Sequence, residues 1–229
     1  MSKSNIEISR VTRTKLQAKA AYNRLSNWYD FLEGGFENKA IVTGITMLRP
    51  QQGEKILELG FGTGISIIHL ARRVGDSGKV YGLDLSEGML HRSQTKVAKE
   101  GLSPKVELMI GDAVNLPYQS GTFDAVFMSF TLELFDTPEI PLVLGECRRV
   151  LKPIGRICIV SMSKKGHGIM LSIYEWAHRT FPRYIDCRPI FLGKVLKESE
   201  FNILESKNFN IWGLPVEISL AQLLDSDSR

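Results

Sequence analysis

The segment Glu58–Gly64, which reads E-L-G-F-G-T-G, constrains the fold of this chain more than any other part of the sequence. Its glycines follow Lys55–Leu59, a run that predicts a buried strand, and precede a helix predicted over Ile65–Val74. Glycines at such a turn let the backbone turn tightly and let a ligand approach without a Cβ in the way. The helix end supplies free amides beside that ligand. The segment therefore predicts an α/β unit with a ligand site beyond the strand.

Short β-rich runs alternate with helical segments along the rest of the chain, which predicts an α/β fold with a parallel sheet covered on both faces. Ser86 is expected to cap the second of these helices. The last two strands are expected to pair in an antiparallel hairpin. The predicted strands are Lys55–Leu59, Lys79–Leu83, Val106–Ile110, Phe123–Ser129, Arg156–Met162, Phe201–Trp212 and Val216–Leu223, and the predicted helices are Ile65–Val74, Glu87–Glu100, Pro138–Leu151 and Ile190–Ser199.

Two regions interrupt this rhythm. Lys15–Gly44 is rich in aromatic residues and predicts a helical lead-in. Ser163–Pro189 predicts an inserted helix and loop, and its aromatic and aliphatic residues make it the expected substrate lid. The length of 229 residues suits one domain, so we expect residues 1–229 to form a single unit, with a lead-in over 1–50 and a lid over 163–189.

Composition excludes several classes of protein. The chain has no apolar run long enough to span a membrane and no apolar stretch near its start, so neither a membrane span nor a secretory signal is expected. Its three cysteines form no paired motif, which favours a reducing cytoplasm and no metal site. The net charge of +4 gathers in two basic stretches, which are either solvated faces or attractive to an anionic substrate or a membrane surface. No nucleic-acid motif accompanies them.

Acidic residues follow the predicted strands at the same edge of the sheet. Asp84 comes 24 residues after Gly60, where a carboxylate can accept the ribose hydroxyls of any adenosine ligand, NAD included. Asp112 ends the third strand, where it can bind an adenine amino group. Asp124, at the start of the fourth strand, is expected to be structural. The glycine spacing E-x-G-x-G-x-G differs from the dinucleotide fingerprint G-x-G-x-x-G.

Together these motifs resemble the class I S-adenosylmethionine-dependent methyltransferases. The lead-in Ala21–Asp30 and the segment Arg148–Arg156, which reads R-R-V-L-K-P-I-G-R, resemble the ubiquinone/menaquinone C-methyltransferase-like family. After the fourth strand this chain has S-F-T-L-E-L at Ser129–Leu134, where that family typically has S-F-G-L-R-N. The resemblance implies a Rossmann-like seven-stranded sheet whose last strand is antiparallel, and it covers about Tyr22 to Ser161.

The same resemblance implies where S-adenosylmethionine binds. The glycine loop, Glu58–Gly64, lines the methionine end of the cofactor, and Asp84 binds the ribose. Asp112 and Ala113 contact the adenine, and Ser129 lies by the sulfonium. Tyr22 or Tyr29 closes over the cofactor, or else packs a helix. The predicted cofactor contacts are Tyr22, Tyr29, Glu58, Gly60, Gly62, Thr63, Gly64, Asp84, Leu85, Met89, Asp112, Ala113 and Ser129.

We therefore expect methyl transfer by direct in-line displacement to a small-molecule or lipid-like acceptor, such as a quinone, a phospholipid amine or another amphipathic metabolite. The candidate bases are Glu133, His167 and His178, with Asp186 also considered. A cytoplasmic monomer or homodimer, with contact to the membrane periphery, fits this acceptor. Two alternatives remain open: a non-catalytic S-adenosylmethionine-binding protein, and an NAD-dependent oxidoreductase.

Overall fold

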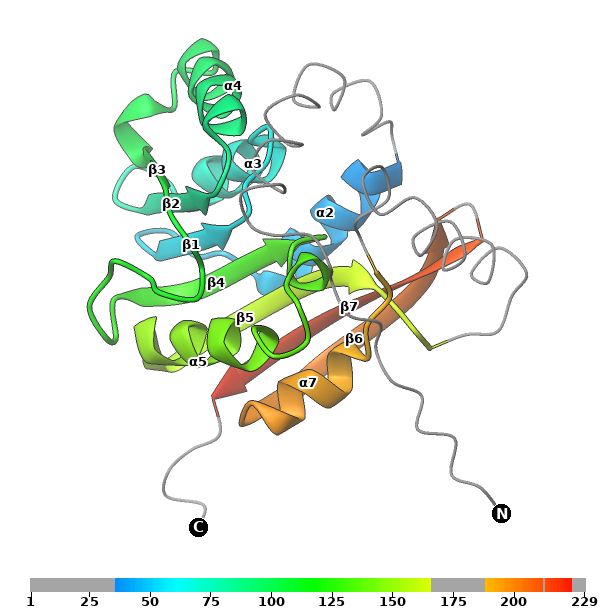
Figure 1. Cartoon of the computed structure of the whole chain (residues 1–229). Coiled ribbons are helices and arrows are strands. Elements are labelled where there is room, and N and C mark those ends of the chain that lie inside the picture. Colours follow the sequence, from blue (N-terminus) through cyan, green and yellow to red (C-terminus); the bar gives the residue numbers. More distant parts are fainter. Residues whose placement is uncertain (1–35, 166–187, 212, 224–229) are drawn as a thin grey trace, which may run out of the picture.

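A seven-stranded sheet organises the computed structural model, which describes residues 36–165, 188–211 and 213–223 (Figure 1). The strand order is β3-β2-β1-β4-β5-β7-β6, and only β7 runs antiparallel to its neighbours. The strands are β1 (Lys55–Leu59), β2 (Lys79–Asp84), β3 (Val106–Ile110), β4 (Phe123–Ser129), β5 (Leu151–Met162), β6 (Phe201–Ile211) and β7 (Leu214–Leu223). The helices are α2 (Phe36–Leu48), α3 (Ile65–Arg73), α4 (Glu87–Lys99), α5 (Ile140–Val150) and α7 (Leu192–Glu198), with short 3-10 turns η1 (Ser103–Lys105) and η2 (Leu132–Leu134).

Helices cover both faces of the sheet, and the strands are apolar because both faces are buried. On one face, α2, α3 and α4 pack over strand residues such as Ile56 and Phe127 (Figure 1). On the other face, α5 and α7 pack over strand residues such as Leu57 and Val126. Successive residues of a strand point to opposite faces, so β1 and β4 contribute to both cores. The predicted Rossmann-like sheet with an antiparallel last strand is confirmed.

The predicted elements agree with the structure apart from their ends. Ser86 caps α4 as predicted, because its side chain accepts a hydrogen bond from the Met89 amide. The fifth strand is assigned from Leu151, whereas the sequence predicted its start at Arg156. The pairing of β4 with β5 shifts register, because Leu151 pairs with Phe123 and Arg156 pairs with Ala125. The residues between them, 152–155, have no partner on β4, and Gly155 lies against the backbone of Lys152 as in a turn. Residues 1–35 and 166–187, which include most of the lead-in and the lid, lie outside the described residues.

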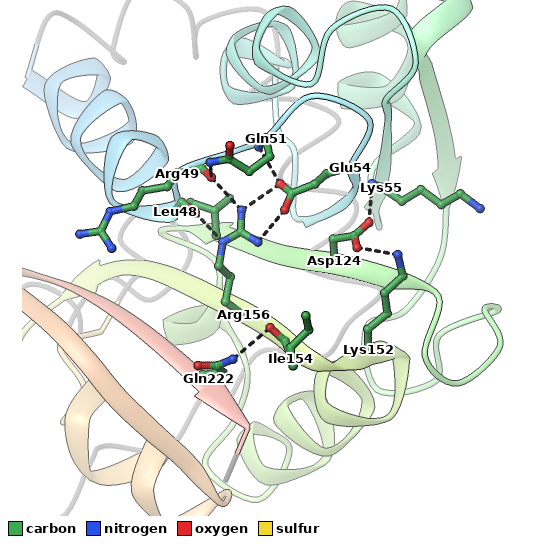
Figure 2. Close-up of polar contacts among 10 residues, drawn as sticks. All are labelled: Leu48, Arg49, Gln51, Glu54, Lys55, Asp124, Lys152, Ile154, Arg156 and Gln222. Carbon is green, nitrogen blue, oxygen red and sulfur yellow. Dashed lines mark hydrogen bonds and ion pairs between the residues drawn. The ribbon is translucent and has the colours of Figure 1, made fainter. Parts of the chain in front are cut away.

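Ion pairs fasten α2 to the amino-terminal edge of the sheet (Figure 2). The Arg156 guanidinium on β5 donates to the backbone oxygens of Leu48, the last residue of α2, and of Arg49, which follows it, at 2.6 and 2.9 Å. It also pairs with both carboxylate oxygens of Glu54, at 2.8 Å each. The last carbonyls of a helix have no partner within it, so Arg156 satisfies them from the sheet.

Asp124 has the structural role predicted for it at the same edge. Its carboxylate accepts a hydrogen bond from the Lys55 amide at 2.9 Å and forms an ion pair with Lys152 at 2.5 Å (Figure 2). These contacts join β4 to the starts of β1 and β5. No helix among the described residues is long and apolar enough to cross a membrane.

Candidate active site

The carboxyl ends of β1, β2 and β4 meet at one edge of the sheet, opposite the ion pairs of Figure 2. Leu59 is paired with Leu83 of β2 on one side and with Met128 of β4 on the other. The Gly60 amide continues this ladder, donating to the Leu83 carbonyl at 2.8 Å. The glycine loop therefore emerges between the ends of two neighbouring strands, where open α/β sheets bind their ligands.

The three glycines of the loop all have left-handed backbone angles, with φ of 71° at Gly60, 49° at Gly62 and 88° at Gly64. Their surroundings differ. A Cβ on Gly60 would lie 2.4 Å from Thr131, and a Cβ on Gly64 would lie 2.2 Å from the Ser93 hydroxyl. A Cβ on Gly62 would meet no atom of the described residues within 4 Å. Gly60 and Gly64 are therefore fixed by packing, whereas no described residue fills the space beside Gly62.

Glu58 lies at the end of β1 and is only 1% exposed. One carboxylate oxygen accepts a hydrogen bond from the Ser66 hydroxyl in the first turn of α3. The other is buried and has no hydrogen-bond partner in the described part of the chain. Burial raises the pKa of Glu58 to about 8, the Ser66 hydrogen bond opposes that rise, and the charge of Asp84 adds to it.

Asp84 ends β2 and holds the glycine loop from the other side. Its two carboxylate oxygens accept hydrogen bonds from the amides of Gly62, at 3.0 Å, and Ser86, at 2.9 Å. Partial burial raises its pKa, and the amide hydrogen bonds oppose that rise. A carboxylate has about four lone-pair sites, so both oxygens can still accept ribose hydroxyls.

The end of β4 presents Ser129, the residue predicted to lie by the sulfonium. Its hydroxyl oxygen is buried and has no hydrogen-bond partner within the described ranges. Phe130 follows with φ of 50°, a left-handed angle that costs a bulky residue about 1–2 kcal/mol. The Phe130 amide donates a hydrogen bond to the Val160 carbonyl at 2.8 Å. Strained backbone of this kind gathers at functional sites.

The other predicted cofactor residues lie on the same edge or support it. Asp112 is half-buried beyond β3 and accepts from the Val114 amide at 3.2 Å, while Ala113 is buried. Thr63 is buried in the loop and accepts from Lys96 of α4 at 2.9 Å. Leu85 and Met89 flank the start of α4, the first half-buried and the second buried.

Glu133 is the one candidate base that the structure describes. It is fully buried in η2, and one of its oxygens accepts the Met162 amide at 3.0 Å. That contact ties the turn after β4 to the end of β5. His167, His178 and Asp186 lie outside the described residues, as do Tyr22 and Tyr29.

Sequence reasoning missed four residues that shape this site: Ser66, Ser93, Lys96 and Thr131. Ser66 orients Glu58, while Thr131 and Ser93 press against Gly60 and Gly64. Only Ser66 had a usable signal, because it stands in the first turn of the helix that the loop opens. The other three are brought to the loop by β4 and α4, and spacing along the chain does not reveal such contacts.

Comparison with known proteins defines the class. A family described as a methyltransferase domain matches residues 56–155. A S-adenosylmethionine-dependent methyltransferase from Aquifex aeolicus has the same fold, with a TM-score of 0.60 at 23% identity over 80% of this chain and 89% of that one. Fold, site and family match together define a class I S-adenosylmethionine-dependent methyltransferase.

Two relatives narrow the class. The demethylmenaquinone methyltransferase of Lactococcus lactis subsp. lactis (strain IL1403) is 35% identical over 85% of this chain and 74% of its own length. The demethylmenaquinone methyltransferase of Staphylococcus aureus (strain JH9) is 31% identical over 84% of this chain and 74% of its own. The chain belongs to the methyltransferase family that includes these enzymes.

Proposed function

We propose that this enzyme methylates a carbon atom of a quinone-like acceptor, with S-adenosylmethionine as the methyl donor. The observation that carries the proposal is the 35% identity to the demethylmenaquinone methyltransferase of Lactococcus lactis over 85% of the chain. The sulfonium methyl is already electrophilic, so the main task of the protein is to hold the acceptor in line with it. No covalent intermediate with the protein is needed.

In this proposal the carboxyl edge of the sheet holds the donor. Glu58 receives the ammonium group of the methionine end on its unpartnered oxygen, and Gly62 leaves room for the ligand against the backbone. Asp84 accepts the ribose hydroxyls, while Asp112 and Ala113 meet the adenine. The Ser129 hydroxyl then lies beside the methyl group that is transferred.

A carbon acceptor also needs a group that removes the proton replaced by the methyl group. We retain Glu133, His167 and His178 as candidates for this base. The Met162 amide already occupies one oxygen of Glu133, which favours a positioning role for this carboxylate. Single-turnover rates of Glu133→Gln, His167→Gln and His178→Gln would separate the candidates, because only loss of the base removes an alkaline rise in rate.

Two measurements test the proposal in order. Calorimetry with S-adenosylhomocysteine is expected to show micromolar binding, whereas NAD is expected to give no heat. Heat with NAD alone would overturn the cofactor assignment. Purified enzyme is then incubated with labelled S-adenosylmethionine and either demethylmenaquinone or phosphatidylethanolamine vesicles. A labelled quinone one methylene heavier is expected, and label in the phospholipid alone would overturn the acceptor.

We also propose that the enzyme acts in the cytoplasm at the membrane periphery, as a monomer or homodimer, because a hydrophobic quinone is reached at a membrane surface. Co-sedimentation with vesicles that contain the quinone is expected to exceed that with vesicles that lack it. Equal co-sedimentation would contradict a role of the acceptor in recruitment.

A further inference from the structure

The carboxyl group of Glu58 lies in surroundings that do not compensate a negative charge. The side chain is 1% exposed, and its one hydrogen bond comes from the neutral hydroxyl of Ser66. The second oxygen is buried without a partner, and Glu58 forms no ion pair with any described residue. An ionised carboxylate that is buried and unpaired is strongly disfavoured, so such groups take up a proton.

None of the described elements packed around Glu58 supplies a positive charge to it. On β2 the residue paired with Glu58 is Gly82, and on β4 it is Phe127, neither of which carries charge. α3 contributes Ser66 alone. The one charged group with an electrostatic influence on Glu58 is Asp84, which is itself negative. The described surroundings thus supply one hydrogen bond, one negative neighbour and no cation.

We propose that Glu58 is protonated in the cofactor-free enzyme and releases its proton when the ammonium group of the cofactor binds, so that cofactor capture is coupled to proton release. This inference rests on the proposed binding of the methionine end at Glu58. The O–H bond of the carboxyl group breaks, its proton leaves to solvent, and the carboxylate accepts a hydrogen bond from the ammonium. Nothing is oxidised or reduced.

Ser66 acts as a positioning residue in this scheme. Its hydroxyl donates to one oxygen of Glu58, and the other oxygen is buried without a partner in the described part of the chain, so in this scheme it accepts from the ammonium. The same hydrogen bond favours the ionised form of the carboxyl group and so limits the rise of its pKa. Ser66→Ala should therefore make the proton harder to remove without changing the charge of the site.

Calorimetry tests the coupling directly. S-adenosylhomocysteine, which carries the same ammonium group, is titrated into the full-length enzyme at pH 6.5 in two buffers with different heats of ionisation. The difference between the buffers counts the protons released, and we expect close to one per ligand bound. Glu58→Gln, which cannot ionise, should bind more weakly and release none. Heat of binding without proton release in the wild type would overturn the proposal, even if the variant failed to fold.

The pH profile supplies a second and independent readout. Between pH 8.5 and pH 6.5 the dissociation constant of the wild type should rise about 20-fold, because Glu58 titrates near 8 in the free enzyme. Ser66→Ala should move the midpoint of this profile to higher pH, and a midpoint that stays in place would refute the role of Ser66. If S-adenosylhomocysteine did not bind at any pH, the result would instead contradict the proposed function on which the coupling rests.

Discussion

Gly60, Gly62 and Gly64 have one backbone conformation but three different environments. Packing against Thr131 and Ser93 explains why the first and third positions exclude a side chain. At Gly62 no described residue occupies the space of a Cβ, so the exclusion there comes from the backbone angle and, in the proposed function, from the cofactor. Substitutions can separate the two effects. Loss of packing lowers the free energy of unfolding, whereas loss of room for the ligand lowers the affinity for S-adenosylhomocysteine.

We predict that Gly64→Ala lowers the free energy of unfolding by about 3 kcal/mol, because a left-handed angle and a steric overlap act together. Gly62→Ala should lose only about 1–2 kcal/mol, for the angle alone, but should weaken S-adenosylhomocysteine binding. Gly121→Ala is the matched control, since Gly121 also has a left-handed angle and open space around it. Urea melts and calorimetry check all three, and unchanged binding in Gly62→Ala would contradict the ligand-side assignment.

The proposed role of Asp84 in binding the ribose can also be tested by substitution. We predict that Asp84→Ala raises the dissociation constant for S-adenosylhomocysteine about 10- to 100-fold, because hydrogen bonds to a charged acceptor are lost. Asp76→Ala is the control, as this carboxylate is exposed and paired only with Lys105. Calorimetry measures both dissociation constants. Equal affinities of Asp84→Ala and Asp76→Ala for S-adenosylhomocysteine would contradict the binding of the ribose by Asp84.

Sequence patterns predicted these residues where the signal was local. Glu58 and Asp84 stand at fixed places after apolar strands, so their position at the ligand edge followed from the parallel sheet. The hydrogen bond from Ser66, the contact of Thr131 with Gly60 and the backbone angle of Phe130 depend on how separate elements meet. The periodicity of a single sequence does not predict such tertiary contacts between separate elements.

At the level of elements, hydrophobic alternation predicted the strands and their order along the chain. The assigned bounds differ between α5 and β5, where Lys152–Gly155 resembles a helix stop followed by a turn. The structure includes these residues in β5, but they have no partner on β4, and Gly155 lies against the backbone of Lys152. The local turn signal therefore survives in the structure, and the ion pair of Lys152 with Asp124 attaches this irregular segment to β4.

Arg156 attaches the end of α2 to the sheet. We predict that Arg156→Ala lowers the free energy of unfolding by about 2–4 kcal/mol, because it leaves Glu54 and the last carbonyls of α2 without their partner. Arg49→Ala removes only the exposed ion pair with Glu205 and should lose less than about 1 kcal/mol. Chemical denaturation measures both, and equal losses would contradict the capping role of Arg156.

Across the whole molecule the two edges of the sheet differ in how their polar groups are satisfied. At the amino edge, the charges of Arg156, Glu54, Asp124 and Lys152 are paired with one another (Figure 2). At the carboxyl edge, buried oxygens of Glu58, Ser93 and Ser129 have no hydrogen-bond partner within the described ranges. One edge therefore stabilises the fold, while the other retains unmet hydrogen-bonding capacity that a ligand can satisfy.

Two carboxyl groups with shifted pKa values, Glu146 on α5 and Glu58 on β1, predict how stability depends on pH. A hydrogen bond and ion pair with Arg149 lower the pKa of Glu146, so its contribution is lost as pH falls through that lowered value. Glu58 acts in the opposite sense, because burial raises its pKa to about 8. Its contribution is complete below pH 4.5, the ordinary value, and is lost as pH rises through about 8.

The unfolding temperature of the cofactor-free enzyme should therefore fall between pH 5 and pH 8.5, by about 2–4 °C for each kcal/mol lost. Glu58→Gln should fall less over the same range, because the amide does not ionise. Saturating S-adenosylhomocysteine should also flatten the wild-type curve, since its ammonium compensates the carboxylate that forms. Differential scanning calorimetry with and without the ligand measures all three curves. Parallel curves for wild type and Glu58→Gln would mean that Glu58 is already ionised in the folded enzyme, and the ligand would then bind a charge that the protein itself stabilises.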